Sequence, residues 1–123
     1  MNILLADDEK INLLSASRLL EKSGYTVTTA INGLEVLDIL KKDDFDCILM
    51  DLEMPKMDGF EATHQIRTDP SFGDKSKIPI IAMTGHSIQD KKYELDKAGI
   101  KEYVSKPFDI AILIQTIKKA TSS

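Results

Sequence analysis

Two segments of the sequence place carboxylates directly after short apolar runs. Asp7 and Asp8 follow the run at 2–6, and Asp51 ends the run that begins at Cys47. Each run has the length of a buried strand, and the carboxyl ends of parallel strands meet at one edge of a sheet. Three carboxylates at one edge repel one another unless a cation neutralises them or some take up protons. Carboxylates, a backbone carbonyl and water suit Mg²⁺, so the pattern predicts a magnesium site.

Two further polar side chains are expected at the same edge. Thr84 follows the apolar run at 78–83, and Lys106 follows a short run at 102–105. A nucleophile, a metal, a cation and a hydrogen-bond donor are what phosphoryl transfer requires. Asp51 is the natural acceptor, and a phosphoryl group of about two negative charges could draw Thr84 and Lys106 toward it. The set favours a phosphorylation switch, whereas Asp51 alone could simply end a strand or cap a turn.

The elements that must position these residues alternate along the chain. Apolar runs of strand length occupy 2–6, 47–50 and 78–83, residues 25–30 alternate an aromatic, Val and Thr, and 102–105 are expected to form a short fifth strand. Helices are expected after these strands, at 11–20, 34–40, 59–67, 87–98 and 110–117. Asn32 with Glu35, and Asp58 with Glu61, are signals for the start of a helix. The helix at 87–98 has a thin apolar stripe and is expected to be weakly held. Residues 68–77 predict a polar, mobile connection.

This alternation predicts an α/β fold with a doubly wound parallel sheet and helices on both faces. Five strands of this kind commonly adopt the flavodoxin-like order 2-1-3-4-5. Ligands then bind where the order reverses, between the first and third strands. Asp7, Asp8 and Asp51 are expected at that point.

Composition limits the classes of protein that need to be considered. The chain has 123 residues and a mass of 13.7 kDa, so a single domain over 1–123 is expected. Its one cysteine, Cys47, excludes an internal disulfide and suits a cytoplasmic setting. The sequence has no apolar stretch of the roughly 20 residues that a bilayer span needs. A net charge of −4 argues against direct binding to nucleic acid.

The sequence resembles the response-regulator receiver domains of two-component signalling, which have a chemotaxis-regulator-like fold. The resemblance covers essentially the whole chain. The motifs that carry it are Ala6-Asp7-Asp8-Glu9, Met50-Asp51-Leu52-Glu53-Met54-Pro55-Lys56-Met57-Asp58-Gly59, Thr84 and Lys106-Pro107. As an ordered set these motifs are specific, although each alone is weak.

The resemblance implies a phosphoacceptor role and a magnesium cofactor. Asp51 would accept a phosphoryl group from a phosphohistidine on a sensor histidine kinase or a histidine phosphotransfer protein. Asp8 would bind Mg²⁺ directly, Asp7 mainly through water, and Glu53 through its backbone carbonyl. The domain would promote its own phosphorylation and dephosphorylation without being an enzyme in the ordinary sense.

The resemblance also implies roles for residues that sense the phosphoryl group. Thr84 and Lys106 would contact it, and Tyr103 would change rotamer as Thr84 is drawn inward, although Tyr103 could instead be a static packed aromatic. The peptide bond before Pro107 is expected to be cis. Gly59 is expected to be structural, because glycine tolerates unusual dihedral angles.

One position departs from the family pattern. Gly85 follows Thr84 where relatives usually carry alanine, and it could loosen the loop and widen access to the phosphoryl group, which would affect the lifetime of the phosphorylated state. His86 either tunes water access together with Glu53 or is an exposed loop histidine. His64 is expected on the surface of a helix.

Three other functions are compatible with parts of the pattern. A flavin-binding module of the same fold is disfavoured because Asp7, Asp8 and Glu9 would repel a flavin phosphate. A magnesium-dependent phosphatase with an aspartate nucleophile would use Glu53 as its second acid, but no insertion shapes a substrate pocket. A degenerate receiver that no longer takes phosphate and only binds partners is disfavoured, because Asp51, Thr84 and Lys106 are all present.

The expected output surface comprises the fourth helix, the fifth strand and the fifth helix. No output segment follows the last helix, so we expect either a free-standing regulator or a receiver from a longer protein such as a hybrid kinase. The sequence predicts no direct nucleic-acid or membrane partner, and a monomer or a phosphorylation-dependent dimer.

Overall fold

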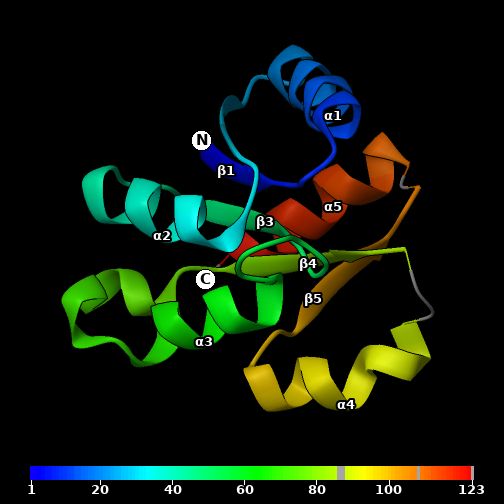
Figure 1. Ribbon diagram of the computed structural model, residues 1–123. Helices are drawn as coiled ribbons and strands as arrows, with labels where there is room; N and C mark the ends of the chain where they lie inside the picture. Colours follow the sequence, from blue (N-terminus) through cyan, green and yellow to red (C-terminus); the bar gives the residue numbers. More distant parts are fainter. Residues whose placement is uncertain (86–87, 108, 123) are drawn as a thin grey trace.

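The computed structural model describes residues 1–85, 88–107 and 109–122, with positions 88–90 described as backbone only. Strands and helices alternate along the chain (Figure 1). The elements are β1 (Asn2–Ala6), α1 (Lys10–Lys22), β2 (Thr26–Ala30), α2 (Gly33–Lys42), β3 (Cys47–Asp51), α3 (Gly59–Thr68), η1 (Pro70–Lys77), β4 (Ile80–Thr84), α4 (Ile88–Ala98), β5 (Glu102–Ser105) and α5 (Ile110–Thr121).

The strands form one parallel sheet in the order β2-β1-β3-β4-β5, which confirms the predicted topology. Ala6 at the end of β1 pairs with Met50 near the end of β3, and Thr84 at the end of β4 pairs with Ser105 at the end of β5. The loops that follow β1, β3, β4 and β5 therefore leave the sheet at the same edge.

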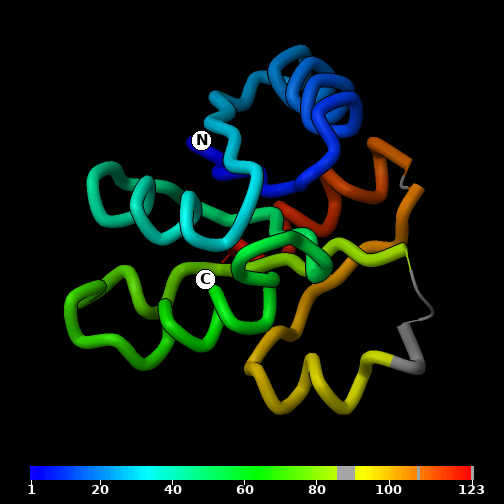
Figure 2. The backbone as a smooth tube through the Cα atoms, viewed as in Figure 1, coloured from blue at the N-terminus to red at the C-terminus, as the bar shows by residue number. Residues whose placement is uncertain are grey.

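Helices cover both faces of the sheet, as Figures 1 and 2 show. α1 and α5 pack on one face, and α2, α3 and α4 pack on the other. Along β1, Ile3 and Leu5 belong to the core under α1 and α5, while Leu4 and Ala6 belong to the core under α2, α3 and α4. Because successive side chains of a strand point to opposite faces, burial on both faces explains why β1, β3 and β4 are largely apolar, whereas β2 and β5, at the edges of the sheet, carry polar and exposed residues.

The two helix starts predicted from the sequence are capped as expected. The Asn32 side chain accepts a hydrogen bond from the Glu35 N–H (2.9 Å), and the Glu35 carboxylate accepts one from the Ile31 N–H (2.8 Å). Asp58 accepts from the Glu61 N–H at 2.9 Å. Each cap satisfies a backbone donor that the helix leaves unpaired.

The connection at 68–77 differs from its prediction as a polar, mobile loop. It forms a 3₁₀ segment, η1, that kinks at Gly73, where φ is 56°. Phe72 is buried within the core under α2 and α3, and the Lys75 ammonium donates to the carbonyl oxygens of Leu40 and Asp43. Contacts of Phe72 and Lys75 with the rest of the fold therefore order a segment whose composition alone indicates a loop.

α4 presents few apolar side chains to the core. Leu95 is fully buried and Ala98 is partly buried, whereas the Tyr93 side chain is 76% exposed. The predicted helix start at Ser87 lies outside the described residues. Across the parts of the chain that the structure describes, every helix is too short or too polar to cross a bilayer.

Candidate acidic site

Three carboxylates gather where β1 and β3 leave the sheet. One oxygen each of Asp7, Asp8 and Asp51 lies within 4.8 Å of the others. Asp7 and Asp51 are buried, and Asp8 is exposed to solvent. The cluster predicted from the sequence thus forms at the predicted position, between the first and third strands.

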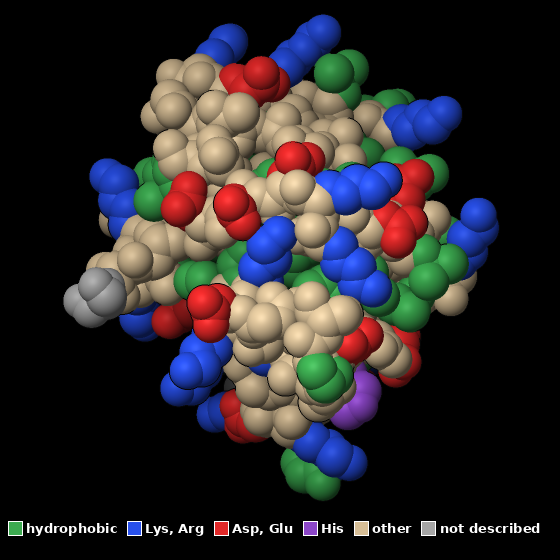
Figure 3. Space-filling model, turned by 90° about the vertical axis from the view of Figure 1, so that its left-hand side faces the viewer, with side chains coloured by type: hydrophobic (Ala, Val, Ile, Leu, Met, Phe, Trp, Pro, Cys, Tyr) green, Lys and Arg blue, Asp and Glu red, His purple; other side chains and the backbone are tan. Residues whose placement is uncertain are grey.

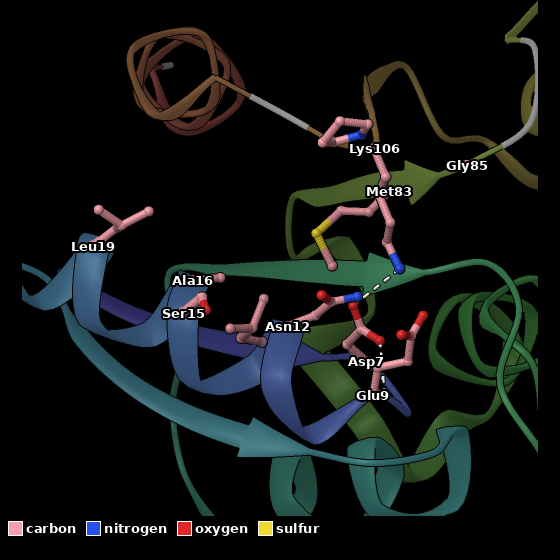
Figure 4. Close-up of a pocket in the computed structure, with 11 residues that line it drawn as sticks. Asp7, Glu9, Asn12, Ser15, Ala16, Leu19, Met83, Gly85 and Lys106 are labelled. Carbon is pink, nitrogen blue, oxygen red and sulfur yellow. Dashed lines mark hydrogen bonds and ion pairs between the residues drawn. The ribbon is translucent and has the colours of Figure 1, made fainter.

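Lys106 reaches this cluster from the end of β5 (Figure 4). Its ammonium lies 2.9 Å from Asp7 Oδ2 and 2.8 Å from Asp51 Oδ2. The Lys106 N–H also donates to the carbonyl oxygen of Thr84 at 2.8 Å. One residue therefore contacts the ends of three strands, β1, β3 and β4.

The second oxygen of each buried carboxylate is held by the loop that follows it. Asp7 Oδ1 accepts from the Glu9 N–H at 2.9 Å, and Asp51 Oδ1 accepts from the Glu53 N–H at 3.1 Å. These bonds and the ion pairs with Lys106 fix both carboxylate planes. Charge-assisted hydrogen bonds of this kind are stronger than neutral ones.

Burial and pairing act against each other at this site. Burial raises the pKa of Asp51, although hydrogen bonds from Lys106 and from the Glu53 N–H oppose the rise. Burial lowers the pKa of Lys106, but its hydrogen bonds to Asp51 and Asp7 outweigh that effect and the pKa is raised overall. Lys106 therefore keeps its positive charge, while Asp51 binds a proton more readily than an exposed aspartate does.

The loop after Asp51 is fixed by close packing. The Leu52 N–H donates to Met83 O (3.1 Å), and the Gly33 N–H at the start of α2 donates to Met57 O (2.9 Å). A β-carbon at Gly59 would clash with the carbonyl oxygen of Asp51. The explanation of Gly59 by unusual dihedral angles was wrong, because its φ is not positive and its requirement is space.

Thr84 and Tyr103 occupy neighbouring strands. Thr84 is buried at the end of β4, and the Tyr103 side chain on β5 is 36% exposed. That exposure disfavours the alternative of a static aromatic packed within the core. The peptide bond between Lys106 and Pro107 is cis, as the resemblance implied.

The residues after Thr84 are only partly described. A β-carbon at Gly85 would meet nothing within 4 Å, so the alanine usual in the family would fit there. His86 lies outside the described residues, and neither interpretation of it is tested. His64 is exposed on α3, which confirms its predicted surface position.

A cavity that the sequence does not predict opens beside the Asp7–Lys106 ion pair. It has a volume of about 480 Å³ and lies along α1, where Asn12, Ser15 and Leu19 contribute to its lining (Figure 4). Met83 and Pro107 also line it. These α1 residues fall outside any recognisable motif, so only the fold reveals that they neighbour the acidic site.

The donor set suits a hard dication. Three carboxylates surround the position and Lys106 offsets only one of their charges. Oxygen ligands are those that Mg²⁺ prefers, and exposed Asp8 leaves room for the water that Mg²⁺ usually retains. The residues present therefore fit a magnesium ion.

A doubly wound sheet with an acid cluster, a buried threonine and a lysine at the carboxyl ends of its strands defines a phosphoacceptor switch domain of the α/β class. The family profile of the response regulator receiver domain matches residues 3–118. The chain belongs to this family and has its phosphoacceptor signalling role in two-component systems.

Relatives occur both as free-standing regulators and within long kinases. The polar-differentiation response regulator DivK of Brucella anthropi is 32% identical, and the match covers 95% of this chain and 93% of DivK. Probable histidine kinase 4 of Oryza sativa subsp. japonica is 40% identical over 96% of this chain. The chain spans only 14% of that kinase and 6% of hybrid signal transduction histidine kinase B of Dictyostelium discoideum.

Solved structures of similar fold include a sensor-kinase receiver and a chemotaxis protein. The receiver domain of sensor histidine kinase PA1611 from Pseudomonas aeruginosa, crystallised with magnesium in its active-site cleft, has a TM-score of 0.88 and 30% identity, with 99% of this chain and 98% of that chain covered. The chemotaxis protein CheY4 of Vibrio cholerae has a TM-score of 0.86 and 31% identity, with 97% of each chain covered.

Proposed function

We propose that Asp51 is the phosphoacceptor of this receiver domain and that its phosphorylation requires magnesium. In the reaction the bond between phosphorus and a histidine nitrogen breaks, and a bond forms between phosphorus and a carboxylate oxygen of Asp51. The observation that carries the proposal is the position of Asp51, buried at the end of β3 in contact with Lys106 and beside two further carboxylates.

Asp8, Asp7, Asp51 and the backbone carbonyl of Glu53 are proposed to hold Mg²⁺. The ion would supply positive charge to the phosphoryl oxygens as the bond to Asp51 forms. The exposure of Asp8 supports its role as the residue that meets the ion first from solvent. The burial of Asp7, and its bonds to Lys106 and the Glu9 N–H, support a less direct role.

Thr84 and Lys106 are proposed to bind the phosphoryl oxygens. Lys106 already contacts Asp51, and a phosphoryl group there would offer its ammonium more negative charge than the carboxylate does. Thr84 would donate a hydrogen bond, and Tyr103 would change rotamer as Thr84 moves. The partly exposed position of Tyr103 supports that freedom.

The donor is proposed to be a phosphohistidine on a sensor histidine kinase or a histidine phosphotransfer protein. Residues 1–123 would act as one receiver domain in the cytoplasm, as a signalling component that promotes its own phosphorylation and dephosphorylation. The proposed output surface comprises α4, β5 and α5, and the sparse burial of α4 supports it. Amide shift changes confined to the opposite side of the sheet on phosphorylation would refute this surface.

Intact mass spectrometry tests the acceptor. The parent chain and an Asp51→Asn variant are incubated with acetyl phosphate, each with Mg²⁺ and each in EDTA. We expect the mass to rise by one phosphoryl group only in the parent with Mg²⁺. A gain by Asp51→Asn would assign the phosphoryl group elsewhere.

A second measurement separates the alternatives if no sample gains mass. Titration with beryllofluoride and Mg²⁺ probes whether the site accepts a phosphoryl mimic. Shift changes at Thr84 would keep the acceptor proposal and place the failure in the small-molecule donor. Unchanged spectra would instead favour a degenerate receiver that only binds partners.

A further inference from the structure

A second pocket lies at the opposite end of the sheet from the acidic site. It has a volume of about 400 Å³ and forms where β4 and β5 begin and α3 and α5 end. We name it the basic pocket after its four cationic residues, Arg67, Lys77, Lys101 and Lys119. Glu102 is the only acid among the described residues that line it. The basic pocket therefore has a formal charge of +3, four cations less one acid, in a chain of net charge −4.

Figure 3 shows the end of the molecule at which the strands begin, where Lys and Arg side chains are interspersed with Asp and Glu. The basic pocket itself is a cavity formed by its lining residues. A concave surface of this kind differs from lysines scattered on a convex helix face. Its volume lies within the range of about 300–1,000 Å³ that is usual for small-molecule sites. The charge and the shape together favour a compact anion.

Arg67 is held in a fixed position within the basic pocket. Its Nη1 donates to the carbonyl oxygens of Ser76 and Ile78, both at 2.7 Å. Its Nε and Nη2 groups have no acceptor in the part of the chain that the structure describes. That edge of a guanidinium can form two parallel hydrogen bonds to a phosphate or carboxylate. Because Arg67 is already ordered, an anion that binds it loses little side-chain entropy.

Stabilisation of helix ends explains only part of this charge. Arg67 and Lys119 lie in the last turns of α3 and α5, where cations offset the negative end of the helix dipole. Lys101 lies outside any helix, between α4 and β5. Lys119 is paired with Glu102 only at 3.8 Å, and its side chain is 76% exposed. Lys101 and the unpaired edge of Arg67 therefore call for another explanation.

We propose that the basic pocket binds a small ligand that carries a phosphate or diphosphate group, with the Arg67 edge as its main contact and Lys77 and Lys101 beside it. The pocket includes Pro79 and Ile80, where β4 begins, and the same strand ends at Thr84 in the acidic site. The bound ligand would thus contact the base of the strand that carries Thr84. This proposal does not depend on phosphorylation of Asp51.

Amide shift titration by NMR tests the proposal. The parent is titrated in metal-free buffer with sodium phosphate, sodium pyrophosphate and, at matched ionic strength, sodium chloride. Metal-free buffer keeps the acidic site from taking up phosphate through Mg²⁺. We expect saturable shifts for phosphate or pyrophosphate at residues 76–78, 80 and 99–102, and none for chloride. Tighter binding of pyrophosphate would indicate a diphosphate ligand, and equal binding a monophosphate.

Paired lysine variants provide the control. Lys77→Gln with Lys101→Gln should weaken binding about tenfold, because each lysine contributes a charged contact. Lys22→Gln with Lys118→Gln removes the same charge from exposed positions outside the basic pocket and should leave binding unchanged. Arg67 itself is left intact because its bonds to Ser76 and Ile78 help to order η1.

Three results would overturn the proposal. Shifts that chloride reproduces would reduce the effect to ionic strength. Equal affinity in the Lys77→Gln, Lys101→Gln variant and the parent would place the ligand elsewhere. Tighter binding of an acidic hexapeptide than of pyrophosphate would assign the surface to a protein partner.

Discussion

The Asp8→Asn substitution should make the protein more stable without metal and less responsive to magnesium. Asp8 belongs to the acidic cluster but is exposed, and the ion pairs of Lys106 join Asp7 and Asp51 instead. Removing its charge therefore relieves repulsion without breaking either ion pair. The same removal takes away a proposed magnesium ligand.

The size of the effect follows from the separation of the carboxylates. At the 4.8 Å limit, two unit charges repel by ~0.9 kcal/mol in water and ~3.5 kcal/mol at an effective dielectric constant of about 20. Because Asp8 is exposed, the lower figure applies to its repulsion with each of Asp7 and Asp51, and the attraction between Asp8 and Lys106 offsets part of that repulsion. We expect a gain of about 1 kcal/mol in the free energy of unfolding in EDTA.

Urea unfolding in EDTA and in Mg²⁺ measures both effects. Magnesium at tenfold its dissociation constant should stabilise the parent by about 1.4 kcal/mol and Asp8→Asn by much less, so the order of stability reverses. Asp74→Asn, at an exposed aspartate on η1, is the matched control and should leave both values unchanged. Equal gains from Mg²⁺ in the parent and Asp8→Asn, or a loss of stability in EDTA, would refute the reasoning.

Three further predictions concern other parts of the fold. Burial, with the nearby charge of Asp46, raises the pKa of the Cys47 thiol from 9.0 to about 12. As the pH rises, the thiol therefore ionises first in the unfolded chain, and the stability of the parent should fall by about 1.4 kcal/mol relative to Cys47→Ala by about pH 10. A stability difference between the parent and Cys47→Ala that stays the same with pH in urea unfolding would contradict this. Gly59→Ala should lower the free energy of unfolding by about 1–3 kcal/mol through its clash with Asp51 O. Gly85→Ala, with open space around it, should raise the free energy of unfolding by about 0.4–1 kcal/mol. Thermal unfolding of both variants tests this, and equal changes in stability would contradict the close approach at Gly59. Lys106→Gln should lower the free energy of unfolding by about 3 kcal/mol in EDTA, because it leaves buried carboxylates unpaired. Lys118→Gln is the control. If urea unfolding shows that Lys106→Gln loses no more stability than Lys118→Gln, the ion pairs of Lys106 contribute little.

The sheet and the acidic cluster could be predicted because both depend on local patterns. Burial on both faces makes each of the three central strands, β1, β3 and β4, a largely apolar run, and parallel strands bring the residues that follow them to one edge. Asp7, Asp8 and Asp51 therefore meet by topology alone. The caps at Asn32 and Asp58 are predictable for a similar reason, since each involves residues three apart.

Features that depend on contacts between distant segments could not be predicted. The requirement for glycine at Gly59 arises from the Asp51 carbonyl, which comes close only after the loop folds back. The order of η1 depends on Lys75 reaching α2, 35 residues away in the sequence at Leu40. Likewise, the basic pocket combines the ends of five elements, and no single stretch of sequence carries its signature.

Lys106 couples the charge on Asp51 to the backbone of two strands. Its ammonium pairs with Asp51, and its N–H bonds to the Thr84 carbonyl, so both contacts belong to one residue. Three carboxylates and one ammonium leave the cluster with a formal charge of −2, which one dication would neutralise. Replacing the Asp51 carboxylate charge by a phosphoryl dianion adds about one negative charge next to that ammonium. Because Lys106 also bonds to Thr84, we expect any shift of its side chain toward the phosphoryl group to alter the ends of β4 and β5 together.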